Sequence, residues 1–277
     1  MTAAPKIAVV GSANVDLVAR TPRLPRPGET VGEASFERIP GGKGANQAVA
    51  AARLGARTSF IGRLGSDDLV LRSLRGADVD VSGVSRDGGE SGLAVVLVDE
   101  DGENMIVVAP GANGRLVPAD VEVGAADAVL VQLEIPDAAV SAAAKRAGEQ
   151  GAFLCLNAAP ARPLGDLHPD LLVLNSNEHE VVGSRPGLVA VTLGAEGAVL
   201  LRDGIQIARA QPPRVEVLDT TGAGDAFCAA LVVSLVEGRD HDSALRRACV
   251  AGALSVTRRG AQPSFPSAAE VDAMLAR

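Results

Sequence analysis

Short apolar runs alternate along the chain with alanine-rich stretches of helical length. KIAVVG (6–11), AFLCLN (152–157) and LVAVTLG (188–194) have the length of buried strands, whereas ANQAVAAARLG (45–55) and DAAVSAAAKRAGEQG (137–151) are long enough for helices. Strands that alternate with helices favour a mostly parallel sheet with helices packed on its faces. The sequence therefore predicts an α/β fold, a three-layer Rossmann-like domain around a mostly parallel central sheet.

Two segments interrupt this alternation. LVARTPRLPRPGETVGEASFERIP (17–40) and GLAVVLVDEDGENMIVVAP (92–110) each read as strands joined by polar turns, the second as a hairpin around Asp101-Gly102. We expect them to form a small β-sheet beside the main domain. Residues 1–277 are then a single domain, with lid segments 17–39 and 91–109 inserted in the α/β core.

Charge and apolar content narrow the classes of partner. The formal net charge of the 277 residues is −8, with acids and bases mixed along the chain, which argues against binding to nucleic acid or to an anionic membrane. The longest apolar run, 226–236, is far shorter than the ~20 residues of a membrane span. Three cysteines, far apart and each in an apolar stretch, indicate free thiols in a reducing compartment. We expect a cytoplasmic protein with a small-molecule ligand.

The stretch DTTGAGDAF (219–227) places a glycine-rich turn between a strand, RVEVL, and an apolar helix, AFCAALVVSLVEG. Such a turn exposes backbone N–H groups and the positive end of the helix dipole, which bind anions such as phosphate. The alternative is that Asp225 only caps the helix. The stretch is not a Walker A loop, because the chain contains no G-x-x-x-x-G-K-[ST].

Two further stretches carry polar groups at the ends of predicted elements. In GSANVDLV (11–18), Asn14 and Asp16 lie two apart in a strand and so share one face, where they could hydrogen-bond neighbouring hydroxyls; an Asx turn is the alternative. In PGGKGANQAVAAARLG (40–55), glycines precede a helix with Lys43 and Asn46 as donors at its mouth, although this could be a plain helix-entry turn.

The combination of these blocks resembles the ribokinase group of the PfkB carbohydrate kinase family. GSANVD, GGKGANQAVAAARLGA, QLEIP, NSNEHE, VTLGAEG, DTTGAGDAF and VTRRGAQPSFP occur in the family's order and at nearly its spacing, from about residue 6 to the C-terminus. The GGKGANQA and GAQPS blocks are more similar to ribokinases than to other sugar or nucleoside kinases. The resemblance implies ATP-dependent phosphorylation of D-ribose at O5, giving D-ribose 5-phosphate.

The resemblance also implies roles for individual residues. Asp225 would be the base, and the turn would supply the anion hole through Gly222, Ala223 and Gly224. The expected sugar contacts are Asn14, Asp16, Gly42, Lys43, Asn46, Glu134 and Asp225. The expected nucleotide contacts are Asn177, Glu180, Thr192, Gly194, Gly224 and Cys249, with Glu180 also holding Mg²⁺ through water and Cys249 having packing as its alternative role. A monovalent cation, K⁺, would be held by Asp219, Thr221, Ser255, Arg258, Gly260 and Ser264.

The position of Asp225 at a helix N-terminus predicts a low pKa and hence a weak base. A weak base would suffice, because in a loose phosphoryl-transfer transition state the hydroxyl proton can leave late. The resemblance further implies a homodimer formed through the lid strands.

Alternatives remain for the substrate and for the class of protein. The substrate could be 2-deoxyribose, a hexose or a nucleoside, and the chain could be a non-catalytic sugar-binding protein on the same fold. Compared with the family's pattern the chain is short near 68–69 and near 182–184. VVGSRPG (181–187) is too short for a parallel crossover, so a missing helix there would put nucleotide binding in doubt.

Overall fold

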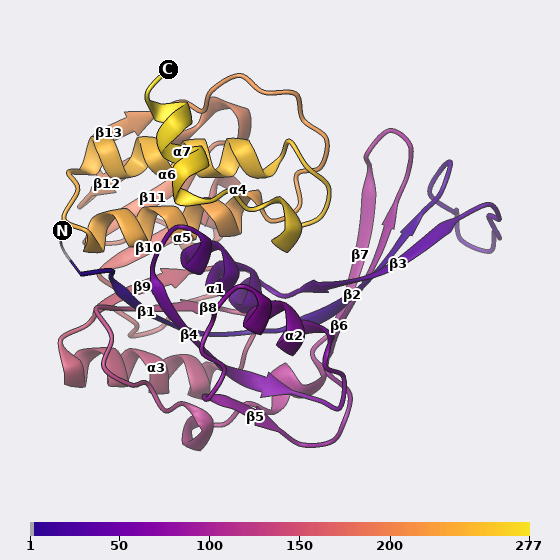
Figure 1. Cartoon of the computed structure of the whole chain (residues 1–277), viewed down its shortest axis with the longest axis horizontal. Coiled ribbons are helices and arrows are strands. Elements are labelled where there is room, and N and C mark those ends of the chain that lie inside the picture. Colours follow the sequence, from indigo (N-terminus) through magenta and orange to yellow (C-terminus); the bar gives the residue numbers. More distant parts are fainter. Residues whose placement is uncertain (1–2) are drawn as a thin grey trace.

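A nine-stranded sheet forms the centre of the computed structural model, which describes residues 3–277 (Figure 1). The strand order is β13-β12-β11-β10-β9-β8-β1-β4-β5. Strands β11 through β5 of this order run parallel, and β12 and β13 are added antiparallel at one edge. The strands are β1 (Lys6–Val10), β4 (Arg57–Leu64), β5 (Val84–Arg86), β8 (Ala128–Gln132), β9 (Phe153–Asn157), β10 (Leu171–Asn175), β11 (Leu188–Thr192), β12 (Ala198–Arg202) and β13 (Ile205–Ala210). The predicted α/β class with a mostly parallel sheet is confirmed.

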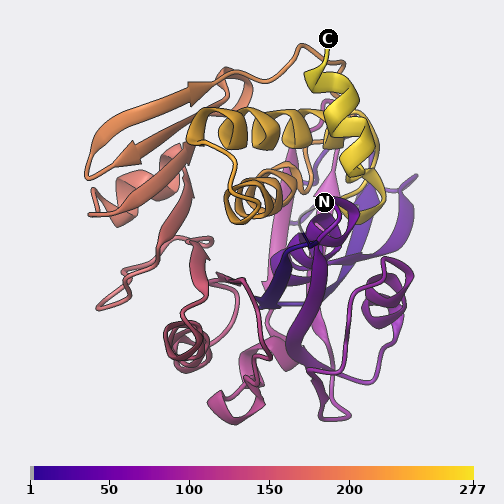
Figure 2. The ribbon, with the colours of Figure 1, turned by 60° about the vertical axis from the view of Figure 1, so that its left-hand side comes forward.

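Helices cover both faces of this sheet, giving three layers (Figures 1 and 2). In β1, Ile7 and Val9 pack into one hydrophobic core and Ala8 and Val10 into the other, so the strand is buried on both sides. The first core includes residues of α1 (Lys43–Arg53), α2 (Leu69–Gly76), α5 (Ala223–Val236), α6 (His241–Ser255) and α7 (Ala268–Leu275). The second includes residues of α3 (Asp137–Gln150) and Val182 of α4 (Ser176–Val182). The 3-10 helices are η1 (Gly111–Arg115), η2 (Pro118–Asp120), η3 (Gly194–Glu196) and η4 (Gln262–Ser264).

A second sheet of four strands projects from the main body (Figure 1). Its order is β3-β2-β6-β7, and we call it the small sheet; its strands are β2 (Asn14–Arg20), β3 (Ser35–Gly41), β6 (Gly92–Val98) and β7 (Asn104–Ala109). The hairpin between β6 and β7 turns at 99–102, where Gly102 N donates to Asp99 O at 3.2 Å. The strands extend beyond the expected limits of 17 and 39, because β2 and β3 pair from Asn14–Gly41 onwards.

The connection from β10 to β11 is long enough to cross over. The two strands pair in parallel, so the prediction that this connection is too short was wrong. The reason is that α4 begins at Ser176, directly after β10, and residues 176–187 all belong to the crossover. Asn175 makes this sharp start possible: its Oδ1 accepts from Glu178 N at 2.8 Å, and Glu178 Oε2 accepts from Asn175 N at 2.7 Å.

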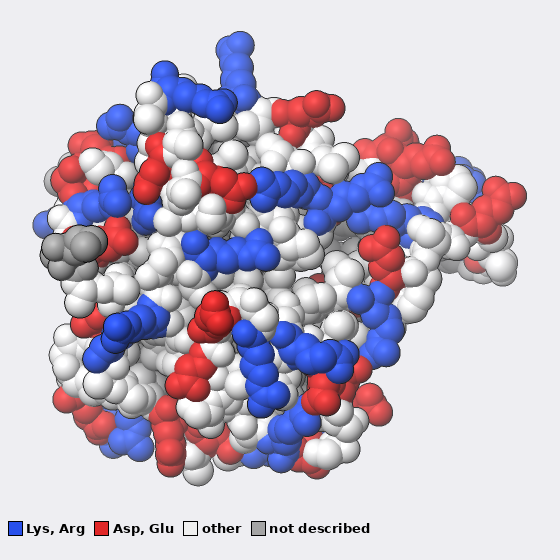
Figure 3. Space-filling view, viewed as in Figure 1, with Lys and Arg blue, Asp and Glu red and all other residues white. Residues whose placement is uncertain are grey.

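Among residues 3–277, no helix has both the length and the apolar content needed to cross a membrane. Acidic and basic side chains are mixed over the face seen in Figure 3, without a large patch of one sign.

Candidate active site

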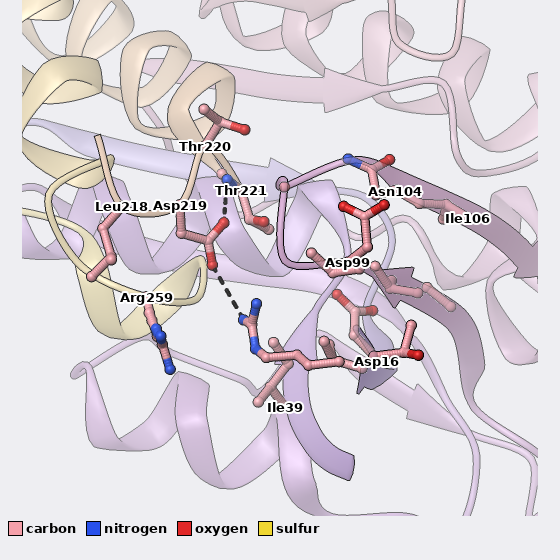
Figure 4. Close-up of a pocket in the computed structure, with 18 of the residues that line it drawn as sticks. Asp16, Ile39, Asp99, Asn104, Ile106, Leu218, Asp219, Thr220, Thr221 and Arg259 are labelled. Carbon is pink, nitrogen blue, oxygen red and sulfur yellow. Dashed lines mark hydrogen bonds and ion pairs between the residues drawn. The ribbon is translucent and has the colours of Figure 1, made fainter. Parts of the chain in front are cut away.

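A cavity of about 960 Å³ lies between the small sheet and the main body. Its walls come from β2, β6 and β7, from the start of α1, from Glu134 after β8, and from the segment that leads into α5 (Figure 4). Glu134 follows the carboxyl end of a parallel strand, the edge at which ligands bind in open α/β sheets. The expected residues Asn14, Asp16, Gly42, Lys43, Asn46, Glu134, Asp219, Thr221, Gly222 and Asp225 all line this cavity.

The turn before α5 presents an open helix N-terminus to the cavity. Gly222 is the N-cap, with φ 80°, and no side chain caps the helix. A Cβ at Gly222 would lie 2.8 Å from Cε1 of Phe265, so glycine is required here for space as well as for its backbone conformation. The uncapped first turn leaves backbone N–H groups and the positive end of the dipole available to an anion.

Asp225 lies in that first turn and is 6% exposed. Its Oδ2 accepts from Asn46 Nδ2 and its Oδ1 from Gln47 Nε2, each at 2.9 Å. Burial raises the pKa of Asp225, and Lys43 together with these two amides only partly opposes it. The expected low pKa was therefore wrong, because the loss of water on burial outweighs the Lys43 charge and the two amide hydrogen bonds, and Asp225 is a stronger base than the sequence indicated.

Both amides that contact Asp225 are held by further amides. Gln47 Oε1 accepts from Gln132 Nε2 at 2.6 Å, and Asn46 Oδ1 accepts from Gln262 Nε2 at 3.1 Å. We call these two chains, Gln132–Gln47 and Gln262–Asn46, the amide relays. Sequence reasoning missed Gln47, Gln132 and Gln262, although GANQA, VQLE and GAQPS each place a buried glutamine beside a residue that it had singled out.

Asn14 and Asp16 face the cavity from the same side of β2, as their spacing predicts. Asn14 Oδ1 accepts from Asn113 Nδ2 at 2.7 Å, and Asn113 is a second residue that sequence reasoning missed. Within residues 3–277, no group hydrogen-bonds the buried Asp16 Oδ1. Burial first, then the charges of Glu134 and Asp225, raise the pKa of Asp16 to about 7.

Lys43 and Glu134 meet at the start of α1. Gly42 is the N-cap of this helix with φ 87°, and Lys43 N donates to Glu134 Oε2 at 3.1 Å. Burial lowers the pKa of the Lys43 ammonium, but the charges of Asp225, Glu134 and Glu178 together raise it by more. The pKa is therefore higher than usual, and the side chain stays charged.

Asp219 joins the turn to the C-terminal segment. Its Oδ1 accepts from Thr221 N and its Oδ2 from Gly260 N, each at 2.9 Å, and Arg20 Nη2 of β2 lies 3.7 Å from Oδ2 (Figure 4). Burial raises the pKa of Asp219, but the hydrogen bonds from Thr221 and Gly260 and the Arg20 charge outweigh it, so the pKa is lower than usual. Asp219 therefore remains ionised.

Three of the other expected cation ligands have side chains that are already engaged in hydrogen bonds or an ion pair. Ser255 Oγ donates to Gly252 O and Ser264 Oγ to Ala261 O, each at 2.8 Å, while Arg258 pairs with Glu270. Across residues 3–277, no cluster of three His, Cys, Asp or Glu side chains could hold a metal ion. The donors available to a monovalent cation are thus the Asp219 carboxylate, the neighbouring Thr221 hydroxyl and backbone carbonyl oxygens.

The expected nucleotide residues, Gly224 of the turn included, are not among the residues that line this cavity, and neither is Ala223. Asn177 and Glu180 are exposed on α4, Thr192 ends β11, Gly194 begins η3, and Cys249 is 5% exposed in α6 with its Sγ 3.7 Å from Ala210 O.

The family resemblance singled out Asn177 and Glu180 of NSNEHE, and a second Asn and Glu lie at the same spacing in that stretch. The other pair, Asn175 and Glu178, forms the capping box of α4. Burial raises the pKa of Glu178, and the nearby Lys43 ammonium partly opposes this, so Glu178 lies within electrostatic reach of the cavity.

Comparisons with known proteins agree on one family. The family model described as pfkB family carbohydrate kinase matches residues 4–268. A ribokinase of Bacillus subtilis is 39% identical over 293 aligned residues, which cover 97% of this chain and 99% of the relative. A deoxyribokinase of Salmonella typhi is 33% identical, covering 94% and 95%. The structure of Arabidopsis thaliana ribokinase complexed with ribose and ATP superposes with a TM-score of 0.84 at 34% identity, covering 98% of this chain and 99% of that one.

Proposed function

Because this chain belongs to the pfkB family of carbohydrate kinases, we propose that it is a ribokinase, which transfers the γ-phosphoryl group of ATP to O5 of D-ribose. The observation that carries the proposal is the placement of Asp225. It is a buried carboxylate at the open N-terminus of α5, in the same cavity as Asn14 and Asp16. A proton acceptor, an anion site and a hydroxyl-binding edge therefore meet in one place.

The geometry assigns each group a step. Asn14 and Asp16 bind hydroxyls of the sugar, and Asp225 accepts the proton of the attacking hydroxyl. The backbone N–H groups of Gly222, Ala223 and Gly224 hold the transferred phosphoryl group, where positioning and electrostatics dominate catalysis. The raised pKa of Asp225 makes it a better proton acceptor than an exposed aspartate.

Mg²⁺ enters this site with ATP, where it neutralises phosphate charge. Its expected contact was Glu180, which is exposed, whereas Glu178 is half-buried and lies near Lys43. We therefore assign the water-mediated contact to Glu178. The nucleotide base lies by Thr192, Gly194 and Cys249, as the family resemblance implies.

K⁺ binds beside the turn in this proposal. Asp219 supplies the charge, and backbone carbonyls of Thr221 and of 255–264 supply the other oxygens, because the two segments are joined by the Asp219–Gly260 hydrogen bond. A bound cation stabilises the turn that leads to the anion hole.

The charge of the cavity favours an uncharged sugar. Eight acidic side chains line it against three basic ones: Asp16, Glu33, Asp99, Glu100, Asp101, Glu134, Asp219 and Asp225 against Arg20, Lys43 and Arg259. A sugar that already carried a phosphate would be repelled. The second candidate is a kinase of 2-deoxyribose, supported by the deoxyribokinase relative.

The small sheet acts as a lid on a single domain and also pairs two copies of the chain. It covers the sugar end of the cavity with Val18, Val96 and Ile106. Strand β7 is at its edge, and Ile106 and Val107, which point to opposite faces, are 56% and 70% exposed. An exposed apolar edge strand is a ready surface for a second, identical sheet. We place the protein in the cytoplasm, where its three buried free cysteines remain reduced.

The test is ADP release with Mg-ATP and D-ribose, 2-deoxyribose, hexoses and nucleosides as acceptors. We expect the highest kcat/KM with D-ribose, strong loss in Asp225→Asn and activation by K⁺ over Na⁺. A higher kcat/KM with 2-deoxyribose would favour the second candidate, and no turnover with any acceptor would leave a sugar-binding protein. Sedimentation of wild type and of a Val107→Asp variant tests pairing, which the variant should disrupt.

A further inference from the structure

Gln132 has a buried side-chain amide whose nitrogen is hydrogen-bonded and whose oxygen is not. Its exposed fraction is 0%, its Nε2 donates to Gln47 Oε1 at 2.6 Å, and its own Oε1 has no partner. A buried acceptor without a partner is destabilising. Gln132 is therefore poorly explained as a residue that only stabilises the core, and the single bond that it makes leads towards Asp225.

Gln47 stands between Gln132 and the base. It is also 0% exposed, and its Nε2 donates to both Asp225 Oδ1 at 2.9 Å and Asn157 Oδ1 at 3.0 Å. A glutamine amide can turn by 180° about its last bond, which exchanges its donor and acceptor ends. Turned that way, its oxygen would face the carboxylate and repel it.

Gln132 Nε2 favours the first of these two orientations together with Asn157 Oδ1, and the Asn157 amide is itself oriented by its Nδ2, which donates to Val173 O at 3.2 Å. With Gln132 Nε2 in place, a turned Gln47 would set two NH₂ groups against each other and two oxygens against each other. The second amide relay has the same construction, since Gln262 Nε2 faces Asn46 Oδ1 while Asn46 Nδ2 faces Asp225 Oδ2. Each carboxylate oxygen of Asp225 thus receives an N–H whose direction is fixed from behind.

We propose that Gln132 is a positioning residue for phosphoryl transfer, which fixes Gln47 with its N–H towards Asp225 and so aims the carboxylate at the attacking hydroxyl. It acts through Gln47 and touches no substrate. The inference rests on the proposed function for its kinetic test, but the protonation of Asp225 can be measured without substrate.

The charged and titratable groups that face Asp225 are Lys43 of α1, Glu134 after β8 and Asp16 of β2. Gln132→Met changes none of these charges. It removes the donor to Gln47, so one buried oxygen without a partner, Gln132 Oε1, is replaced by another, Gln47 Oε1. We therefore expect little change in stability and a clear change at the carboxylate.

The first measurement is the pKa of Asp225 by ¹³C NMR of labelled aspartate carboxyls in the protein without ligands. Partial loss of one neutral donor should move this pKa upwards by about 0.5–1 unit in Gln132→Met. The control is Ser234→Ala, which removes a fully buried hydroxyl of α5 that donates to Ala230 O and accepts from Arg247 Nη1, and which leaves the relays intact. An unchanged pKa in Gln132→Met overturns the proposal, whether or not the protein phosphorylates ribose.

The second measurement is kinetic. Gln132→Met should lower kcat about 5- to 50-fold with KM for ribose within twofold, and the acid limb of the kcat–pH profile should move up with the pKa. In a Gln47→Met background the same change should have no further effect, because Gln132 acts only through Gln47. Additive losses would refute that route.

Gln132→Glu provides the same test if the methionine variant does not fold. When the introduced carboxyl is ionised it can only accept, so it draws Gln47 Nε2 away from Asp225, whereas the protonated acid still donates to Gln47 Oε1. The ratio of the kcat of this variant to that of wild type should therefore approach one at low pH and fall as pH rises. A parallel profile at all pH values would contradict the proposal.

Discussion

Replacing Asp16 by asparagine should stabilise the free protein above neutral pH while it weakens sugar binding. Asp16 is a carboxyl whose pKa burial and the charges of Glu134 and Asp225 raise to about 7 from 3.8. One of its oxygens has no partner. The site therefore holds an acid in surroundings that disfavour its charge, and an amide of the same shape avoids that penalty.

The sign and size of the effect follow from the pKa. The folded state holds the proton of Asp16 more tightly than the unfolded state, so its contribution to stability is complete below pH 3.8 and is lost as pH rises through about 7. A difference of about 3 pH units corresponds to about 4 kcal/mol. Asp16→Asn escapes this loss, so its stability advantage over wild type should widen by about 2–3 kcal/mol between pH 5 and pH 8.

Urea unfolding of both proteins at pH 5 and pH 8 measures this difference. Asp219→Asn is the control of opposite sign, because the pKa of Asp219 is lowered and its charge stabilises the fold above pH 3.8. Ribose affinity of wild type should rise about tenfold from pH 6 to pH 8 as Asp16 ionises, and that of Asp16→Asn should be weak and independent of pH. A stability gap that is equal at both pH values would show that the reasoning on Asp16 is wrong.

Three further changes test the site. Asp225→Asn keeps the shape but cannot accept the proton, so kcat should fall by roughly 10²–10⁴ with little change in ATP affinity measured by calorimetry. Gly222→Ala places a Cβ 2.8 Å from Cε1 of Phe265 and 2.9 Å from Cβ of Ala261 at φ 80°, so both the melting temperature and kcat should fall; wild-type kcat would remove the turn from the anion hole. Arg20→Gln should speed hydrogen exchange of the Thr221 and Gly260 amides, whose N–H groups donate to Asp219, whereas Arg23→Gln, at an exposed arginine, should not. Equal exchange rates in the two variants would mean that the Arg20–Asp219 ion pair does not stabilise this turn.

Local patterns in the sequence were sufficient for the fold class and for Asn14, Asp16 and Lys43 in the cavity, whereas Glu134 and Asp219 were expected only from the family resemblance. Glycine turns before helices and the i, i+2 spacing of Asn14 and Asp16 depend on neighbours along the chain. The contacts of Asp225 with Asn46 and Gln47 do not, since they join residues about 180 positions apart. Their effect on its pKa, and that of burial, could not be read from a local motif.

The length of the crossover after β10 was also mispredicted, although here the contacts that decide it are local. Its length depends on where α4 begins, and that start is set by the hydrogen bonds between Asn175 and Glu178 rather than by hydrophobic periodicity. The buried glutamines Gln132 and Gln262 could not be predicted as functional, because a single polar residue forms no repeating pattern in the sequence.

Strand β2 carries Asn14 and Asp16 near one end and Arg20 at the other, all on the face towards the cavity. It is bonded along its length to β3 and to β6, so it cannot bend without breaking ladders on both sides. From Asp16 to Arg20 the strand spans about 13 Å at about 3.3 Å per residue. A tilt of this stiff lever when a sugar seats at one end must displace the guanidinium at the other. The sugar-binding side chains and the ion pair with Asp219 are thus mechanically coupled through one strand.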